Sequence, residues 1–141
     1  MTEPTQVDLE AVVAMMPFAR SAGVVVAAAT PGEVMGYLEW APERCTTAGV
    51  LHGGALITLA DSVGAVCAVL NLPPGATTST IESKTNFFRG VRNGRVHATA
   101  RPLHVGRSVI VVQTDLRDDV GKAVAMTVQT QSVLRPDTPR G

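Results

Sequence analysis

One uninterrupted apolar stretch constrains the fold of this chain more than any other feature, GGALITLADSVGAVCAVLNL at residues 53–72. A helix over these residues is apolar on every face, which predicts a helix enclosed by protein. A membrane span is the competing interpretation of such a run. The acid Asp61 near its centre, the many small residues and the strand-like flanks argue against a membrane. Pro73-Pro74-Gly75 then ends the helix.

Segments on both sides of this helix have the patterns of β-strands. They cover residues 22–29, 34–40, 78–88, 95–101, 109–117 and 123–134. Residues 95–101 alternate cleanly between apolar and polar side chains. A short helix over residues 8–16, ended by Pro17, is expected to come first. One apolar helix among antiparallel strands predicts an α+β fold in which a long sheet wraps around the helix.

Composition narrows the class of protein. A chain of 141 residues, 45% apolar and 17% charged, is long enough for one globular domain with a core. Twelve basic and twelve acidic residues leave no net charge, so nucleic acid and an anionic membrane are not expected partners. The acidic first ten residues do not resemble a secretory signal, which predicts a cytoplasmic protein. Two buried free thiols, Cys45 and Cys67, are favoured over one disulfide.

Asp61 is the only charged residue in the apolar stretch. An ionised carboxylate inside protein is costly unless it is paired or faces solvent. One structural explanation is a bond to backbone or a buried ion pair. The other is a reactive group facing a cleft, which the small residues on the same helical face favour by leaving room for a ligand or a second helix.

The start of the helix is a second candidate feature. His52-Gly53-Gly54 precedes the apolar run, so backbone N–H groups there are uncovered and the helix dipole adds partial positive charge. Such donors stabilise a carbonyl oxygen that becomes negative during a reaction. The plain alternative is that the glycines only permit a tight turn.

Spacing predicts that these two features do not act together within one chain. Asp61 lies seven positions after Gly54, which is roughly 10 Å along a helix. Two such helices packed antiparallel about a two-fold axis would bring each Asp61 close to the other chain's Gly53. We therefore expect a homo-oligomer with active sites shared between subunits.

The segment His52-Gly53-Gly54-Ala55-Leu56, followed by Ala60-Asp61-Ser62, resembles the signature of the hotdog-fold acyl-CoA thioesterases. The resemblance covers about residues 35–134 and is strongest to the branch with phenylacetyl-CoA and 4-hydroxybenzoyl-CoA thioesterases. It implies a hotdog domain over residues 21–135, after an N-terminal helix and lead-in at 1–20 and before a flexible tail at 136–141. It also implies a cytoplasmic homotetramer built as a dimer of dimers.

The resemblance further implies residue roles. Asp61 would be the nucleophile or the general base that activates water, the Gly53 N–H would polarise the thioester carbonyl, and His52 would hold the loop or contact the thioester. No metal and no cofactor is expected, since coenzyme A is part of the substrate. Related enzymes often carry Asn or Gln six residues before the histidine, where this chain has Thr46, whose hydroxyl is the expected substitute.

Contacts to the substrate are expected along the helix and at basic positions. Some relatives place Ser or Thr four residues after the acid, where this chain has Ala65. The phosphates of coenzyme A require basic groups and backbone donors near a pocket mouth. The expected substrate-binding residues are Gly54, Thr58, Ala65, Arg89, Arg95, His104, Gly106, Arg107 and Ser108, with Arg92 a further basic candidate.

Three other functions compete with this interpretation. A serine hydrolase is disfavoured because Ala60 stands where a GxSxG motif needs its first glycine. A hotdog enoyl-CoA hydratase or dehydratase would pair a histidine and an acid for proton transfer. A non-catalytic acyl-CoA sensor would keep the pocket without needing the carboxylate.

Overall fold

Six strands pair into one antiparallel sheet in the order β1-β2-β4-β5-β6-β3 in the computed structural model, which describes residues 7–136. The central strands bury every second side chain along much of their length, as the alternating sequence predicts. The strands are β1 (Val25–Thr30), β2 (Glu33–Glu39), β3 (Thr80–Phe87), β4 (Arg95–Val105), β5 (Val109–Arg117) and β6 (Ala123–Ser132).

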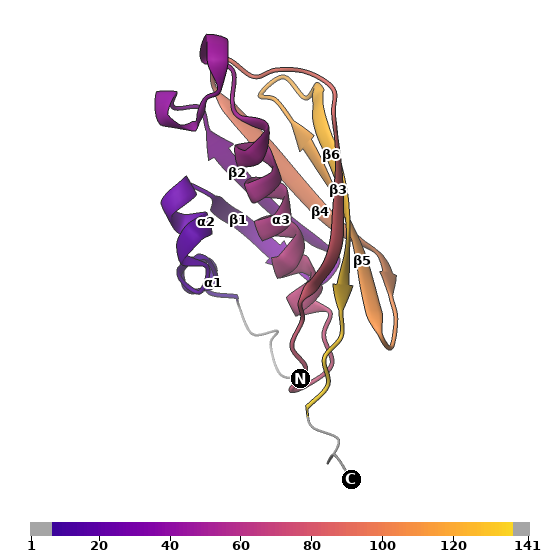
Figure 1. Cartoon of the computed structure of the whole chain (residues 1–141). Helices are drawn as coiled ribbons and strands as arrows, with labels where there is room; N and C mark the ends of the chain where they lie inside the picture. Colours follow the sequence, from indigo (N-terminus) through magenta and orange to yellow (C-terminus); the bar gives the residue numbers. More distant parts are fainter. Residues whose placement is uncertain (1–6, 137–141) are drawn as a thin grey trace.

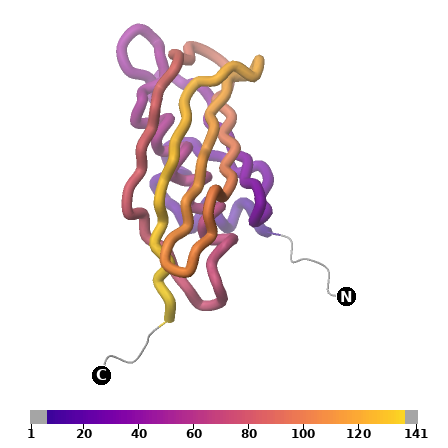
Figure 2. The backbone as a smooth tube through the Cα atoms, turned by 90° about the vertical axis from the view of Figure 1, so that its right-hand side faces the viewer, coloured from indigo at the N-terminus to yellow at the C-terminus, as the bar shows by residue number. Residues whose placement is uncertain are grey.

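Helix α3 (Gly53–Leu70) lies against one face of this sheet, and the sheet curves past it (Figure 1). Viewed from the side in Figure 2, the long strands stand in front of the helix. Leu59, Val63 and Cys67 are fully buried between the helix and the strands. A single long helix against a long antiparallel sheet confirms the predicted α+β hotdog fold.

Both ends of α3 are held by side chains. His52 caps the N-terminus, and Asn71 caps the C-terminus. The Asn71 Nδ2 donates to Cys67 O at 2.8 Å and to Pro31 O at 2.7 Å, which ties the helix end to the turn between β1 and β2. By length and composition α3 is apolar enough to cross a membrane, yet half of it is buried within the fold as its core helix.

The N-terminal region corrects one expectation. The predicted helix over residues 8–16 is present as α1 (Leu9–Ala14) and ends before Pro17, but a second helix, α2 (Pro17–Ala22), was not predicted. Pro17 begins α2, because the first position of a helix needs no N–H donor and has the φ that proline imposes. β1 accordingly begins at Val25. The irregular segment that follows β2 contains two short 3-10 turns, η1 (Pro42–Arg44) and η2 (Thr47–Gly49).

One face of α3 is not covered within the single chain. Ile57 is 40% exposed and Val69 is 52% exposed, so a helix enclosed on every side was a wrong expectation for one subunit. The neighbouring edge strand β3 is exposed along most of its length. The predicted domain bounds stay a prediction, and the expected tail at 136–141 lies outside the described residues except for Pro136.

Candidate active site

The first turn of α3 leaves one backbone donor open. The Gly54 N–H donates to His52 Nδ1 at 2.7 Å, and the N–H groups of Ala55 and Leu56 donate to His52 O at 2.9 and 3.2 Å. Within residues 7–136 the Gly53 N–H has no hydrogen-bond acceptor. The donor predicted to polarise a carbonyl is therefore the one that the helix cap leaves free.

The ring of Phe87 flanks this donor. A Cβ placed on Gly53 would lie 3.4 Å from Phe87 Cζ, so the aromatic ring packs directly against the glycine backbone. Phe87 ends β3 and is 50% exposed. The open N–H thus lies beside an apolar wall that one side of a bound acyl group can contact.

Asp61 lies two turns further along α3, on its partly open face, and is half-buried. Gln129 Nε2 donates to Asp61 Oδ1 at 3.4 Å, a long hydrogen bond from the buried face of β6. Burial raises the pKa of Asp61 above 3.8, and the Gln129 hydrogen bond partly opposes that rise. The carboxylate is neither sealed in the core nor paired with a cation among the described residues, which leaves it available for chemistry.

Gly53 and Asp61 are well separated along α3. The eight-residue offset corresponds to roughly 12 Å of helix rise, since each residue advances about 1.5 Å. Their shared face is the uncovered one, on which Ile57, Ala65 and Val69 also lie partly or largely exposed. The single chain therefore presents a donor and a carboxylate on one open surface but does not bring them together.

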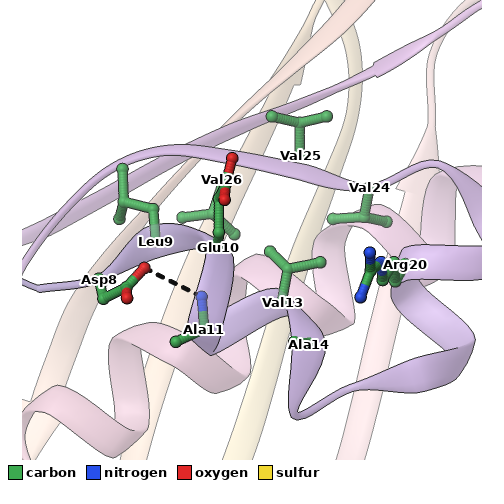
Figure 3. A pocket seen from close by; sticks show the side chains of 10 residues that line it. All are labelled: Asp8, Leu9, Glu10, Ala11, Val13, Ala14, Arg20, Val24, Val25 and Val26. Atoms are coloured by element: carbon green, nitrogen blue, oxygen red, sulfur yellow. Dashed lines mark hydrogen bonds between the residues drawn. The ribbon is translucent and has the colours of Figure 1, made fainter.

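A cavity of about 460 Å³ opens beside the start of α3. Its walls combine part of the predicted site, namely His52, Gly54 and Thr58, with side chains of α2 and of the loop before α3. The complete lining is Phe18, Ser21, Ala22, Glu43, Arg44, Cys45, His52, Gly54, Ala55 and Thr58. A larger groove of about 560 Å³ between α1, α2 and β1 contains none of the predicted site residues (Figure 3).

The hydroxyl groups of the helix are largely used in its own hydrogen bonds. Thr58 Oγ1 donates to Gly54 O at 2.8 Å, and Ser62 Oγ donates to Thr58 O at 2.6 Å. Thr58 borders the cavity, whereas Ser62 is buried. Thr46 is exposed in the loop before α3, where its backbone N–H donates to Val50 O.

The predicted coenzyme A contacts fall into separate places within one chain. Arg89 follows β3 and forms a 3.4 Å ion pair with Asp118. Arg95 lies on the outward face of β4, where it pairs with Glu39 at 2.8 Å and stacks over Tyr37 at 4.0 Å. These two arginines lie near the end of the sheet at which α3 begins.

The segment from His104 to Ser108 lies at the opposite end of the sheet, where β4 turns into β5 (Figure 1). A Cβ on Gly106 would lie 2.5 Å from His104 Nε2, so the histidine ring packs closely on this glycine. Arg135 Nη2 donates to Arg107 O at 3.1 Å. Within one chain this segment therefore lies far from the Gly53 N–H.

Sequence reasoning missed Gln129 and Gln131. Both are buried on the inner face of β6, with exposed fractions of 0% and 1%. The available signal was their spacing of two, which places them on one face together with Thr127. Polar residues at alternate strand positions usually mark the solvent face, so the pattern alone indicated the wrong side.

The two cysteines differ in burial, and neither belongs to a metal site among the described residues. Cys67 is buried, but Cys45 is only half-buried, so the expectation of two buried thiols is wrong for Cys45. Both are free, as predicted. Among residues 7–136 no group of three His, Cys, Asp or Glu side chains has the arrangement of a metal site.

An antiparallel sheet around one helix, with an open N–H at the helix start and a carboxylate on the same helix, has the arrangement expected of a hotdog-fold thioesterase. The family model described as "Thioesterase superfamily" matches residues 48–125, more than half of the chain, which includes α3 and the two candidate features. The chain belongs to the thioesterase superfamily.

Relatives support the same assignment. A protein of Haemophilus influenzae that bears an esterase name is 37% identical over 86 residues, 61% of this chain and 62% of the relative. The 1,4-dihydroxy-2-naphthoyl-CoA hydrolase of Escherichia coli is 34% identical over 86 residues, 61% of this chain and 63% of that enzyme. The matched segments thus span about three fifths of these curated relatives.

Solved structures extend the likeness over the whole fold. A crystal structure of a thioesterase from Haemophilus influenzae superposes with a TM-score of 0.88 at 26% identity, covering 100% of both chains. The predicted family and fold are therefore confirmed. The roles of individual residues stay predictions.

Proposed function

We propose that this chain is an acyl-CoA thioesterase that hydrolyses the thioester of a small to medium acyl or aryl group. The observation that carries the proposal is the pairing of an accessible carboxylate, Asp61, with the free N–H of Gly53 on one open helix face. Family membership and the name of the Escherichia coli relative support thioester chemistry.

The Gly53 N–H is the electrostatic element of the proposed mechanism. It donates to the thioester carbonyl oxygen and stabilises the negative charge that develops when the carbonyl carbon becomes tetrahedral. The positive end of the α3 dipole acts on the same oxygen. The cap by His52 keeps this donor fixed in direction.

Asp61 promotes attack on the carbonyl carbon by one of two routes. As a general base, it takes a proton from water while the water oxygen attacks the carbonyl carbon, and the proton then passes to the departing thiolate. As a nucleophile, its carboxylate attacks directly, the thiol leaves, and water hydrolyses the resulting anhydride. Both routes need an ionised Asp61 and give a free carboxylic acid and coenzyme A.

The separation of Gly53 and Asp61 along α3 supports a site shared by two subunits. We infer that a second copy packs its α3 antiparallel on the open face of the first, placing each Asp61 next to the partner subunit's donor. The exposed side chains of Ile57, Val69 and Ile81 are the apolar surface that such a contact would bury. A dimer of dimers in the cytoplasm is the proposed form of the protein.

The coenzyme A moiety has its proposed contacts at the basic and glycine-containing positions. Arg89 comes two residues after Phe87, whose ring packs on Gly53 at the α3 start, while Gly106, Arg107 and Ser108 would come from the partner subunit across the same interface. Arg95 is the weakest candidate, because Glu39 already pairs with it on the outward face. No cofactor or metal is needed for this chemistry.

A panel of acyl- and aryl-CoA thioesters with a thiol reagent tests the function directly. The wild-type chain should release coenzyme A from at least one member, and Asp61→Asn should reduce turnover by roughly a hundredfold or more. Asp115→Asn is the matched control, since Asp115 lies on the outward side of β5. Release that persists within a few-fold in Asp61→Asn would contradict the assigned role.

The same panel separates the competing functions. Tight binding without release in the wild type would favour the sensor. Conversion of an enoyl-CoA without thiol release would favour a hydratase. Label found in Asp61 after a single turnover in heavy-oxygen water identifies the nucleophilic route, because only an anhydride that water opens at the Asp61 carbon places label there.

A further inference from the structure

Asp61 receives one side-chain hydrogen bond within residues 7–136, and its donor is Gln129. Gln129 extends from the centre of β6 across the interior to α3, and none of its surface is exposed. A fully buried amide is unfavourable unless its hydrogen-bonding groups are used. Filling space in the core therefore does not explain why a glutamine lies beside Asp61, the one carboxylate of α3.

Gly64 provides the space that Gln129 occupies. Gly64 is buried on α3 one turn after Asp61, and a Cβ built there would overlap Gln129 Oε1 and lie 2.8 Å from Gln129 Cδ. Any larger residue would push the amide away from the helix. Glycine within a helix costs stability relative to alanine, so the absence of a side chain at this place matches the need to seat the amide.

A chain of hydrogen bonds links the buried Gln129 amide to Gln131 and to the start of β3. Gln129 Nε2 donates to Gln131 Oε1 at 3.0 Å, and the same oxygen accepts from Thr80 Oγ1 at 2.6 Å. Gln131 Nε2 donates to Thr78 Oγ1 at 3.2 Å. Because an ionised Asp61 carboxylate can only accept, Gln129 presents its nitrogen to it, and the other proton of that nitrogen is donated to Gln131 Oε1.

This orientation leaves the amide oxygen of Gln129 without a hydrogen bond within residues 7–136, which is unfavourable for a buried acceptor. Gln129 Oε1 is buried and has no partner among the described residues, as is also true of Thr114 Oγ1. Both atoms lie close to the space over Gly64. An apolar side chain of the same length would avoid this unpaired acceptor, so packing alone does not account for a glutamine here.

We propose that Gln129 is a positioning residue that holds Oδ1 of Asp61 and leaves Oδ2 free to face water or the thioester carbonyl. The inference rests on the proposed function, since it assigns Asp61 a reactive oxygen. The same hydrogen bond favours the ionised carboxylate and so opposes the rise in the pKa of Asp61 that burial causes. Gln129 thus fills the supporting role that Ala65 has no group to perform.

Gln129→Met tests the proposal because methionine keeps the length of the side chain and removes the amide. The matched control is Thr127→Val, a fully buried residue on the same face of β6 whose hydroxyl bonds to Thr85 and not to Asp61. We expect kcat to fall about tenfold or more in Gln129→Met with KM within about twofold, because the substrate does not touch Gln129. Thr127→Val should leave both values nearly unchanged.

A second readout is independent of turnover. Carbon-13 NMR of the Asp61 carboxyl should show its titration moving to higher pH in Gln129→Met, and the acid limb of the pH–rate profile should move the same way. Gly64→Ala should reproduce both changes in a chain that keeps Gln129, by displacing the amide. It is also the variant to use where Gln129→Met fails to fold.

The outcomes are decisive in either direction. The proposal requires that Gln129→Met lower kcat and also shift the Asp61 titration to higher pH. If either kcat or the Asp61 titration in Gln129→Met is the same as in Thr127→Val, the proposal is wrong. Should the wild-type chain cleave no thioester at all, the proposed function fails. The NMR titration still decides whether Gln129 holds Asp61.

Discussion

The Nδ1 atom of His52 accepts the Gly54 N–H at 2.7 Å, so a single ring atom caps α3 and fixes the position of the imidazole proton. An acceptor nitrogen carries no hydrogen, which in neutral imidazole places the proton on Nε2. His52 is exposed and borders the cavity beside the helix start. The histidine therefore offers one donor, the Nε2–H, toward a ligand while its other nitrogen holds the helix.

Two substitutions separate these roles of His52. His52→Ala removes the cap and should lower the free energy of unfolding by about 1 kcal/mol, whereas His52→Asn keeps a capping oxygen and should lose much less. Both remove the Nε2–H, so both should lower kcat/KM if that donor contacts the thioester. Urea denaturation and steady-state kinetics on the two variants provide the comparison. Full activity in His52→Asn would limit the histidine to capping.

Asp61→Asn should stabilise the fold at neutral pH. Because burial raises the folded-state pKa of Asp61 above 3.8, the folded chain binds the proton more tightly than the unfolded chain. The stability that Asp61 contributes through its proton is therefore fully present below the pKa that Asp61 has in the unfolded chain. It is lost as the pH rises through the pKa that Asp61 has in the folded chain. Asp61→Asn does not lose this stability as the pH rises, because asparagine does not ionise.

The measurement is urea denaturation of wild type and Asp61→Asn at pH 4 and pH 7. The advantage of the variant in free energy of unfolding should be larger at pH 7. Asp115→Asn, on the outward side of β5, is the control for a generic change of charge. If the difference in free energy of unfolding between Asp61→Asn and wild type instead became smaller at pH 7, the folded chain would stabilise the ionised Asp61 carboxylate relative to the unfolded chain.

Gly53→Pro should remove the donor and keep the helix. Proline suits the first helical position, and His52, with φ −63° and ψ 135°, has the backbone that a residue before proline adopts. Loss of one such donor costs roughly 100- to 1,000-fold in kcat in well-studied hydrolases. Gly53→Ala, which keeps the N–H and adds only a Cβ near Phe87, is the matched control and should lose far less. Equal losses in the two variants would point to crowding.

How far the sequence predicts this molecule depends on whether a feature is local. Residues 109–117 were predicted as a strand and form β5 with the same bounds, because period-two alternation is visible within the segment. The helix over 53–72 ends at Leu70, close to the predicted stop. Asp61 and Gly53 can be singled out as candidates for the same reason, since one is an acid in an apolar run and the other begins it.

Features set by distant contacts were not predictable. Gln129 is important only because β6 packs beneath Asp61 and Gly64 leaves room, and neither fact can be read from residues near Gln129. Pro17 is compatible with ending one helix and with starting another. Both occur here, and the start of α2 at Pro17 places Ala22 O where Arg44 Nε donates to it at 2.7 Å, a contact between residues 22 positions apart.

The two cysteines should differ sharply toward alkylating reagents. Burial raises the pKa of Cys67 to about 11, and no part of its side chain is exposed, so almost no thiolate is present or accessible at neutral pH. Cys45 is half-buried in the wall of the cavity, where its Sγ contacts Ala41 O at 3.3 Å. Iodoacetamide on the native protein should modify Cys45 alone, and mass spectrometry after unfolding should show both modified. Native labelling of Cys67 would indicate that α3 opens from the sheet.

The shared site gives the most demanding prediction, because it concerns two inactive proteins that become active together. Asp61→Asn retains the Gly53 donor but lacks the carboxylate, and Gly53→Pro retains the carboxylate but lacks the donor. In a hybrid dimer, one site combines the intact Gly53 of the first chain with the intact Asp61 of the second. The other site contains both defects.

Random reassortment makes half of the dimers hybrids, each with one working site of two, so activity should return to about a quarter of the wild-type value. The two variants should be given different tags, unfolded together and refolded, with each variant refolded alone as the control. Hybrids isolated through both tags should have about half the wild-type activity. A site built within one chain has no means of recovery on mixing, since every chain then carries its own defect. Activity no greater than the sum of the separate variants would therefore place Gly53 and Asp61 in the same subunit's site and overturn the antiparallel arrangement of α3.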